Sequence, residues 1–400
     1  MLIGLIGKSN VGKSTFFNAA TAHAVQTANY PFTTIEPNIG IGYVRTKCVC
    51  TEFGVQDNPV HSICVTGNRF IPVRILDVAG LVPDAHKGKG LGNQFLDSSR
   101  EANALVHIID IAGTTDLEGH TVKPGEGDPL KDVEFVLAEF DLWMVSLLKK
   151  NLDKISRDLQ NRSEKLSKVL ARQLSGLSMT EGHIMTALID TGLVGKRLDS
   201  WSNSDLFEFC RNLRRLAKPM IIAANKADIR SAESNLERLT ALEYRSVPCV
   251  SEAEVMLRLG AKSGLLRYLP GDSSFEVNPN AELHDEQKEA LKKVQSVLMK
   301  YGSTGVQQIL NKVCFELLEM VVVYPIEDEN KLTDKNGNVL PDAYLVPKDS
   351  TAKDLADKVH EELGKGFLYA IDARSKQRLG AEYKMKDRDV IKIVSVASKR

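Results

Sequence analysis

The stretch LIGLIGKSNVGKST, residues 2–15, decides the fold of this chain. Residues 2–6 are apolar and predict a buried strand, and a helix is expected to begin at about Ser14. Between them, Gly7-Lys8-Ser9-Asn10-Val11-Gly12-Lys13-Ser14 fits the pattern G-x-x-x-x-G-K-S/T of a phosphate-binding loop. Its glycines let backbone N–H groups surround phosphates, and the helix N-terminus adds its positive end.

The last two residues of this loop have specific expected roles. Lys13 is expected to reach the β- and γ-phosphates and to act in catalysis, and the Ser14 hydroxyl is expected to bind Mg²⁺. A chance glycine turn is the alternative, and the flanking strand and helix disfavour it.

A second motif, Asp77-Val78-Ala79-Gly80, ends another apolar run, residues 73–78. It fits D-x-x-G, in which the aspartate holds Mg²⁺ through water and the glycine N–H senses the γ-phosphate. We therefore expect Asp77 at the metal and Gly80 in catalysis.

A third motif, Asn225-Lys226-Ala227-Asp228, closes a predicted strand at residues 219–224 and fits N-K-x-D. Asp228 can accept hydrogen bonds from guanine N1–H and its exocyclic amine, whereas adenine would leave the carboxylate unpaired. The motif favours GTP over ATP; a helix-initiating turn is the alternative. Ser251 and Glu252, after the next predicted strand, are expected to cap the base through backbone N–H groups.

Composition limits the class of protein. The 400 residues predict two or three domains, and 43% hydrophobic with 26% charged residues is an ordinary globular mixture. The 52 basic and 52 acidic residues argue against a wholly basic nucleic-acid coat protein. No apolar run approaches a membrane span and the start lacks a signal-peptide pattern, so we expect a cytoplasmic protein without membrane contact.

The strand and helix alternation, with a further strand at residues 104–110, predicts an α/β domain with its ligand at the strand ends. It breaks between residues 128 and 198. There, apolar residues follow one heptad frame and predict a long helix in an antiparallel hairpin or coiled coil that turns near residues 175–178 and returns through 184–189. The frame contains Val145, Leu148, Leu152, Ile155, Leu159, Leu166 and Val169. A purely structural helical insertion is the alternative to a functional one.

The end of the chain predicts a small α+β unit. Two helices are expected before this unit, at residues 285–300 and 305–318; the unit itself has about 80 residues, with strands at 320–326, 344–346, 367–371 and 390–396. Asn336-Gly337 predicts a hairpin turn, which we favour over a calcium loop at residues 334–338. Thr351 and Asp354 predict a capping box for a helix that ends near Gly364.

Together with residues 30–40, these motifs resemble the Obg/YchF group of translation-factor-class GTPases. Residues 30–40 look like the family's first switch, in which Thr34 matches the Mg²⁺-sensing threonine and Thr33 is the alternative ligand; residues 81–92 look like the glycine-rich second switch. The last 80 residues look like a TGS domain, a β-grasp module. The resemblance implies a P-loop GTPase domain (1–127 and 199–317), a coiled-coil-like helical insertion (128–198) and a TGS domain (318–400), in a GTP-using, archaeal-type member that keeps N-K-x-D.

The residue after D-x-x-G is Leu81, where Ras-like proteins place a water-orienting glutamine. We therefore expect slow intrinsic hydrolysis. In related GTPases with this substitution, an asparagine at the position of Asn10 helps to hold K⁺ near the phosphates; the alternative is that Asn10 bonds only within its own loop. His86 and His120 are candidate water-positioning groups, and solvated loop histidines are the simpler interpretation.

The expected partners beyond GTP and GDP follow from a basic stretch. Residues 149–172 contain eight basic and three acidic side chains, which suit an RNA backbone or a solvated helix face. We expect a monomeric GTP-hydrolysing switch that acts on the ribosome or ribosomal RNA. The alternative is a regulatory, stress-signalling switch that acts through protein–protein contacts; Asp228 and Leu81 argue against a kinase or ATPase.

Six cysteines in 400 residues are too few for a disulfide scaffold. Cys48, Cys50, His61 and Cys64 are ligand types that suit Zn²⁺, but their spacing is not a familiar zinc pattern. We favour reduced cysteines on a hairpin and leave zinc as the alternative.

Overall fold

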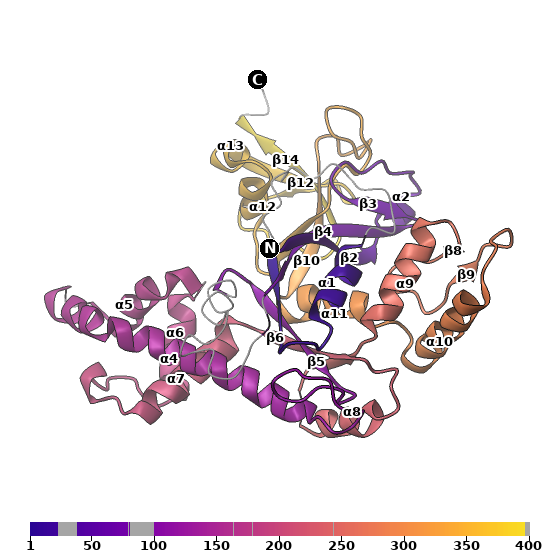
Figure 1. The fold of residues 1–400 in the computed structure, drawn as a ribbon. Helices are drawn as coiled ribbons and strands as arrows, with labels where there is room; N and C mark the ends of the chain where they lie inside the picture. The colour runs from indigo at the N-terminus through magenta and orange to yellow at the C-terminus, as the bar shows by residue number, and fades with distance from the viewer. Residues whose placement is uncertain are drawn as a thin grey trace.

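The computed structural model describes residues 1–22, 38–78, 80, 100–162, 164–177, 179–242 and 244–396. Figure 1 shows the C-terminal sheet, with β12 and β14, above a first sheet that runs through the middle of the molecule, and a helical arm that extends to the lower left. The expected first and second switches, with Thr34, Leu81 and His86, lie outside the described residues except for Asn38, Ile39 and Gly40.

The first sheet carries the phosphate-loop strand at its centre. It has the order β2-β4-β1-β5-β6-β7, and β3 also pairs with β4. β4, β1, β5, β6 and β7 are parallel, while β2 and β3 run antiparallel to β4. Its strands are β1 (Leu2–Ile6), β2 (Ile39–Lys47), β3 (Ile63–Val65), β4 (Asn68–Asp77), β5 (Ala104–Asp110), β6 (Met220–Asn225) and β7 (Ser246–Pro248). The four strands predicted at residues 2–6, 73–78, 104–110 and 219–224 are therefore confirmed, but β4 begins earlier than expected.

Helices cover both faces of this sheet. The group packed around it consists of α1 (Lys13–Thr21), α2 (Cys50–Phe53), α8 (Ala232–Ala241), α9 (Ser251–Lys262), α10 (Asp285–Tyr301) and α11 (Val306–Lys312), followed by a π-helical turn (Val313–Leu317). A short ribbon, β8 (Leu266–Arg267) and β9 (Glu276–Val277), joins α9 to α10. α1 approaches β2 closely because β2 carries glycines: a Cβ at Gly40 would lie 2.5 Å from the Thr21 side chain.

The helical arm contains α4 (Pro129–Arg162), α5 (Leu166–Gln173), α6 (Glu181–Asp190) and α7 (Asn203–Ala217), with 3₁₀ turns at Ser175–Leu177 and Leu198–Ser200. The expected heptad residues do pack into its core. The expectation of one helix running through residue 169 was wrong, since α4 ends at Arg162 and Lys165 is extended (φ −67°, ψ 142°) before α5 begins. Leu206 and Phe209 of α7 lie in the same hydrophobic cluster as the other arm helices, and this cluster continues into residues of the first sheet such as Leu2 and Leu105.

The C-terminal unit is a five-stranded sheet of order β11-β10-β14-β12-β13. Its elements are β10 (Met320–Ile326), β11 (Tyr344–Pro347), α12 (Ala352–Val359), α13 (Glu361–Lys365), β12 (Phe367–Asp372), β13 (Arg378–Leu379) and β14 (Asp389–Ser395). The capping box of Thr351 and Asp354 is present, but the expected single helix is broken at His360. Asn336-Gly337 does form a turn, between isolated bridges and not between two strands.

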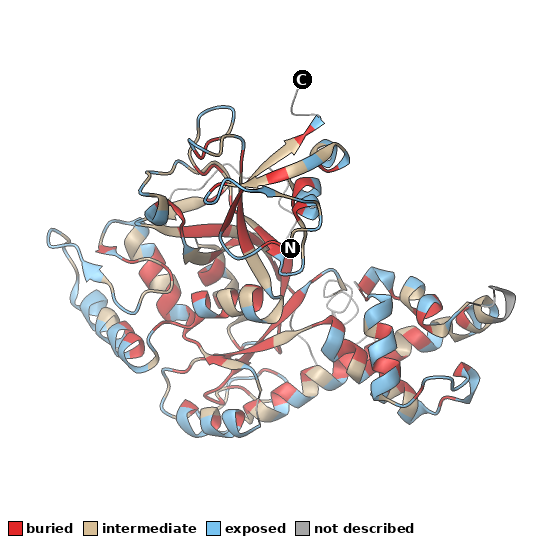
Figure 2. Ribbon diagram, turned by 180° about the vertical axis from the view of Figure 1, so that it is seen from behind, coloured by how far each residue is buried: buried red, intermediate tan, exposed pale blue. Residues whose placement is uncertain are grey.

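The alternating side chains of β10 explain how the two sheets join. Val322, Tyr324 and Ile326 are buried with core residues of the first sheet, whereas Val323 packs under α12. Figure 2 shows the buried strands continuing from one sheet into the next, with exposed positions along the arm and the outer helices. No helix among the described residues is both long and apolar enough to cross a membrane.

Candidate functional site

The phosphate loop connects β1 to α1 in a conformation that requires its glycines. Gly12 has φ 91°, and a Cβ there would lie 2.3 Å from Asn225 Nδ2. A Cβ at Gly7 would lie 2.4 Å from Ile108 O on the neighbouring strand. The N-terminus of α1 therefore opens on a tight loop with the backbone geometry that an anion site needs.

The expected metal-binding corner is assembled from two strand ends. Asp77 ends β4, which is parallel to β1, so its carboxylate comes to the start of α1. Ser14 Oγ donates to Asp77 Oδ2 at 3.0 Å, and Lys13 Nζ lies 3.2 Å from Asp77 Oδ1. A hydroxyl and a carboxylate are hard oxygen donors, so these residues fit Mg²⁺. Gly80 lies against the phosphate loop, since a Cβ on Gly80 would be 2.9 Å from Ser9 Oγ.

Asn225 joins the phosphate loop to the expected base-capping loop. Its Nδ2 donates to Val11 O at 2.9 Å, and its Oδ1 accepts from Ser251 N at 3.1 Å and Ser251 Oγ at 2.9 Å. Both residues are buried. Asn225 therefore uses both ends of its amide to fix two separate loops, as a buried polar group should.

Lys226 reaches back across the phosphate loop. Its Nζ donates to Asn10 O at 3.2 Å, to Asp110 Oδ2 at 2.9 Å and to Thr114 Oγ1 at 2.9 Å. Asp110 Oδ2 also accepts from Thr114 N and from the hydroxyls of Thr114 and Thr115. This network holds the loop after β5 beside the phosphate loop.

The expected base pocket lies next to these contacts. Asp228 is exposed and lines a cavity of about 600 Å³ together with Glu252 and residues of α9 and α10. The Ser251 hydroxyl donates to Asn225 and does not line this cavity. Nothing in the sequence pattern indicated that α10 would form the opposite wall.

Two phosphate-loop side chains have unexpected partners. Lys8 is buried, and its Nζ contacts Thr115 O at 3.1 Å, Asp116 O at 2.6 Å and Asp132 Oδ2 at 2.7 Å, so only its backbone is left to face a nucleotide. Burial raises the pKa of the Asp132 carboxyl to about 6, and the Lys8 ammonium opposes that shift. Asn10 Nδ2 donates to Gly119 O at 2.9 Å, outside its own loop.

The loop of residues 110–127 is the part of the site that the sequence motifs missed. It packs so closely on the phosphate loop that a Cβ at Gly119 would lie 2.8 Å from Ser9 Cβ. Its cluster of threonine and aspartate after β5 was the available signal. His120, a candidate water-positioning group, is highly exposed at 72% and lies 3.2 Å from Asp116.

The sequence matches three family models in chain order. The model described as "50S ribosome-binding GTPase" matches residues 2–167, "Obg-like GTPase YGR210-like, G4 motif-containing domain" matches 223–328, and "TGS domain" matches 333–395. These ranges include the phosphate loop, the N-K-x-D motif and the C-terminal sheet without β10, respectively.

Similar proteins extend over the whole chain. An uncharacterized GTP-binding protein of Methanocaldococcus jannaschii is 49% identical over 399 residues, 99% of each chain. The crystal structure of a GTP binding protein from Pyrococcus horikoshii has 38% identity and a TM-score of 0.79, covering 99% of this chain and 100% of that one. A protein of Buchnera aphidicola named ribosome-binding ATPase YchF is 27% identical over 377 residues, 92% of this chain and 86% of that one. The chain belongs to the Obg/YchF-type family of GTP-binding P-loop GTPases with a C-terminal TGS domain.

Proposed function

We propose that this protein is a GTP-hydrolysing switch that binds the ribosome through RNA contacts of its helical arm. The observation that carries the proposal is a row of cations on α4. Lys150, Lys154 and Arg157 are exposed and follow one another at the i, i+4 and i+7 spacing that places side chains on one face of a helix.

These cations are available for a phosphate backbone. Neither lysine forms an ion pair with any residue that the structure describes, and Arg157 bonds only to the Asp153 carbonyl of its own helix within the same ranges. Exposed Lys165, just before α5, and exposed Lys168 in α5 lie next along the chain. Arg172, by contrast, pairs with Glu164 at 2.9 Å and contributes less free charge. Such a row suits a polyanion, whose binding releases counterions.

The family names support the choice of polyanion. The model that matches residues 2–167 is described as a 50S ribosome-binding GTPase, and the Buchnera relative is named as ribosome-binding. We assign the contact to RNA of the large ribosomal subunit on these grounds.

The nucleotide site supplies the switch. In our proposal Mg²⁺ is held by Ser14, Asp77 and Thr34, and Lys13 leaves Asp77 to neutralise the β- and γ-phosphates. Backbone N–H groups of residues 7–14 bind phosphate oxygens, Gly80 N–H senses the γ-phosphate, and Asp228 with the Ser251–Glu252 backbone selects guanine. Asn10 is the proposed K⁺ ligand: its bond to Gly119 O fixes the amide plane and thereby the direction of Oδ1.

Co-sedimentation with separated ribosomal subunits tests the proposal. The protein loaded with a non-hydrolysable GTP analogue is expected to pellet with the large subunit more than the GDP form does. Lys150→Glu/Lys154→Glu should weaken this binding at every salt concentration, and reduce the slope of log affinity against log salt by about 2 if both cations contact phosphates.

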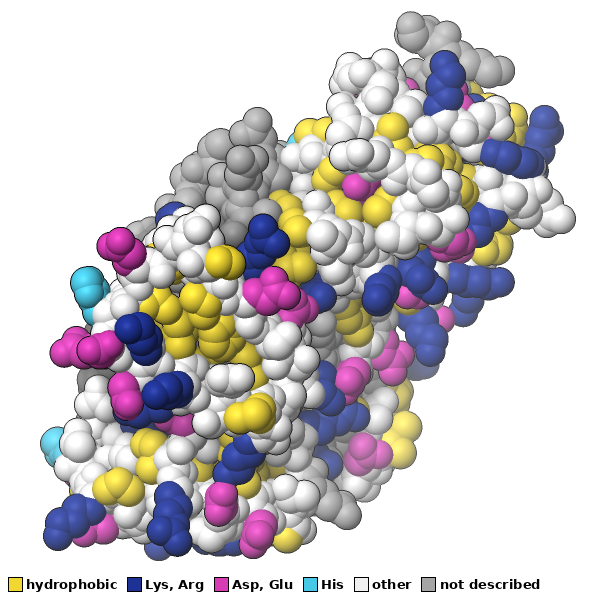
Figure 3. Space-filling model, turned by 90° about the vertical axis from the view of Figure 1, so that its right-hand side faces the viewer, with side chains coloured by type: hydrophobic (Ala, Val, Ile, Leu, Met, Phe, Trp, Pro, Cys, Tyr) yellow, Lys and Arg dark blue, Asp and Glu magenta, His cyan; other side chains and the backbone are white. Residues whose placement is uncertain are grey.

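A matched control reverses two lysines that are also four residues apart but lie on another helix. Lys288→Glu/Lys292→Glu reverses two exposed lysines on α10, on the side shown in Figure 3, where basic and acidic side chains are mixed with hydrophobic patches. This variant should bind the subunit like the parent. Equal loss in both variants would refute the α4 row as the contact, and no pelleting in either nucleotide state would refute the ribosome assignment and favour the stress-signalling switch acting through protein contacts.

A further inference from the structure

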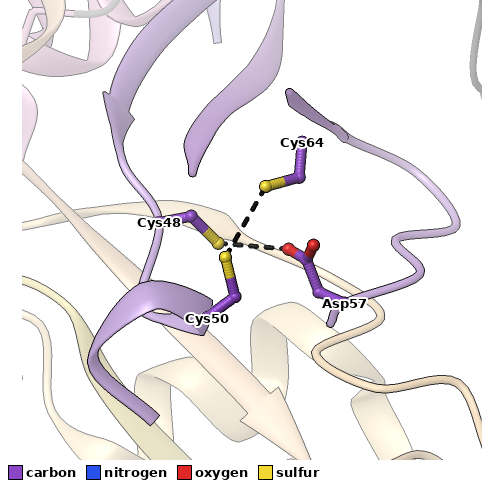
Figure 4. Close-up of side chains that lie close together, drawn as sticks. All are labelled: Cys48, Cys50, Asp57 and Cys64. Carbon is purple, nitrogen blue, oxygen red and sulfur yellow. Dashed lines mark hydrogen bonds between the residues drawn. The ribbon is translucent and has the colours of Figure 1, made fainter. Parts of the chain in front are cut away.

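Three cysteines and one aspartate converge beside the junction of the two sheets. Cys48 follows β2, Cys50 opens α2, Asp57 lies in the next loop and Cys64 lies in β3 (Figure 4). Their four ligand atoms all lie within 4.8 Å of one another. Cys48 and Cys50 are buried, and the Asp57 side chain is only 9% exposed, so the cluster is largely closed to solvent.

Two distances within the cluster are close to the edges of a tetrahedral zinc site. A Zn–S bond of about 2.3 Å places two ligand sulfurs about 3.8 Å apart, and a sulfur and a carboxylate oxygen about 3.5 Å apart. Cys50 Sγ and Cys64 Sγ are 3.8 Å apart, and the Cys48 thiol donates to Asp57 Oδ2 at 3.2 Å. These two edges are within about 0.3 Å of the tetrahedral values, and the other pairs of donor atoms lie within 4.8 Å, so shifts of about 1 Å or less would let the four donors enclose one ion.

We propose that Cys48, Cys50, Asp57 and Cys64 bind one structural Zn²⁺. Three thiolates and a carboxylate complete a four-coordinate set and leave no position for substrate, which is typical of structural and not catalytic zinc. Binding displaces the three thiol protons to solvent and does not change the oxidation state of any atom.

Buried Arg69 supports this ligand set from outside. Its Nη2 donates to Asp57 Oδ2 at 2.7 Å and its Nε donates to Cys48 Sγ at 3.4 Å. Such partners orient metal ligands, and the guanidinium offsets part of the negative charge that four anionic ligands leave around a divalent ion. Arg69 itself is anchored by Ser62 Oγ at 2.8 Å and Leu340 O at 3.0 Å.

The site would fasten the C-terminal unit to the first sheet. Between Asp57 and Cys64 the chain bonds to the C-terminal unit: Asn58 N donates to Val339 O at 3.1 Å and Val60 N donates to Pro341 O at 2.8 Å. His61 Nδ1 lies 2.8 Å from Asp342 Oδ1, and His61 is not among the four residues whose ligand atoms converge. Zinc at the base of this loop would hold rigid the segment on which the C-terminal unit docks.

Metal analysis of tag-free protein, purified under reducing conditions without chelator, tests the proposal. We expect about one zinc per chain after dialysis. Cys50→Ser and Cys64→Ser should each lower this content at least about tenfold, as loss of a ligand does. His61→Ala and Cys210→Ala should retain it, because His61 faces Asp342 and Cys210 is buried in the arm core. Cobalt substitution of the parent should give the absorption of tetrahedral thiolate-bound Co²⁺.

A second measurement protects the test against misfolded variants. Removing zinc from the folded parent with a strong chelator should raise amide exchange at residues 58–61 and 338–342 and leave the arm unchanged. The proposal is overturned if the parent retains no zinc after reconstitution, if His61→Ala loses the metal as Cys64→Ser does, or if peptide mapping finds a Cys50–Cys64 disulfide in its place.

Discussion

Asn225→Ala should separate nucleotide affinity from the integrity of the fold. The substitution removes three buried hydrogen bonds, one to Val11 O and two from Ser251. Each contributes about 0.5–1.5 kcal/mol net, so the total is about 3 kcal/mol. Because these bonds fix two loops expected to contact the nucleotide, we expect most of this loss to appear in binding, as a GDP affinity about 10²-fold weaker.

Titration calorimetry with GDP and Mg²⁺ measures this loss, and thermal unfolding without nucleotide reports the fold. The control is Asn235→Ala, which removes a similarly buried asparagine whose Nδ2 donates to Ile111 O at 3.0 Å from α8. It should lower the unfolding temperature and leave the GDP affinity within about threefold of the parent. If the GDP affinity of Asn225→Ala equals that of the control, the hydrogen bonds of Asn225 do not fix the nucleotide-binding loops, and the reasoning is refuted.

Four further outcomes are expected. Ser14→Ala should abolish hydrolysis and weaken GTP binding more than GDP binding, measured with and without Mg²⁺; near-normal turnover would contradict its role at the metal. The parent should bind GTP at least ~10²-fold more tightly than ATP, and Asp228→Asn should erode that preference in calorimetry; equal ATP binding by the parent would refute the base assignment. Replacing K⁺ by Na⁺ should slow single-turnover hydrolysis in the parent and not in Asn10→Ala, whereas equal parent rates would reject the cation. Burial lowers the pKa of His107 to about 3, so the unfolded chain binds a proton at a higher pH than the folded chain does, and stability falls as the pH drops below 6.5. Between pH 7 and 5 the unfolding free energy of the parent should fall by about 2 kcal/mol more than that of His107→Leu. Parallel pH profiles of the two proteins would contradict this.

The sequence predicted the parts of the fold that depend on local patterns. The strand before the phosphate loop, the strand at residues 104–110 and the capping box at Thr351 follow from apolar runs and from short-range hydrogen bonding, and the structure has all three. The arm core was also predictable, because seven apolar residues keep one frame. The frame did not reveal that α4 ends at Arg162 and that Lys165 is extended, since a heptad pattern indicates which side chains are buried and not whether the backbone between them is continuous.

Long-range polar contacts could not be predicted in this way. Lys8 fits the loop motif as a nucleotide-binding residue, yet its side chain is satisfied by carbonyls of Thr115 and Asp116 far along the chain. Similarly, His61 was as good a metal ligand as Asp57 by residue type. Only the fold, which turns His61 toward Asp342 and Asp57 toward Cys48, distinguishes them. Motifs name the residues that face a ligand, while the partners of buried charges depend on tertiary structure.

The partner of Lys8 bears on how a nucleotide signal reaches the arm. Asp132 lies in the first turn of α4, so the phosphate loop is joined by a buried ion pair to the root of the helix that carries Lys150 and Lys154. All three N–H donors of the ammonium are used, which makes the junction rigid and costly to break. α4 is continuous from Pro129 to Arg162, and at 1.5 Å per residue the ion pair lies about 27 Å along the axis from Lys150. In the proposed switch the arm would therefore act as a stiff lever rooted beside the phosphate loop, and a small rotation of its root would move the proposed RNA-binding row by a much larger distance.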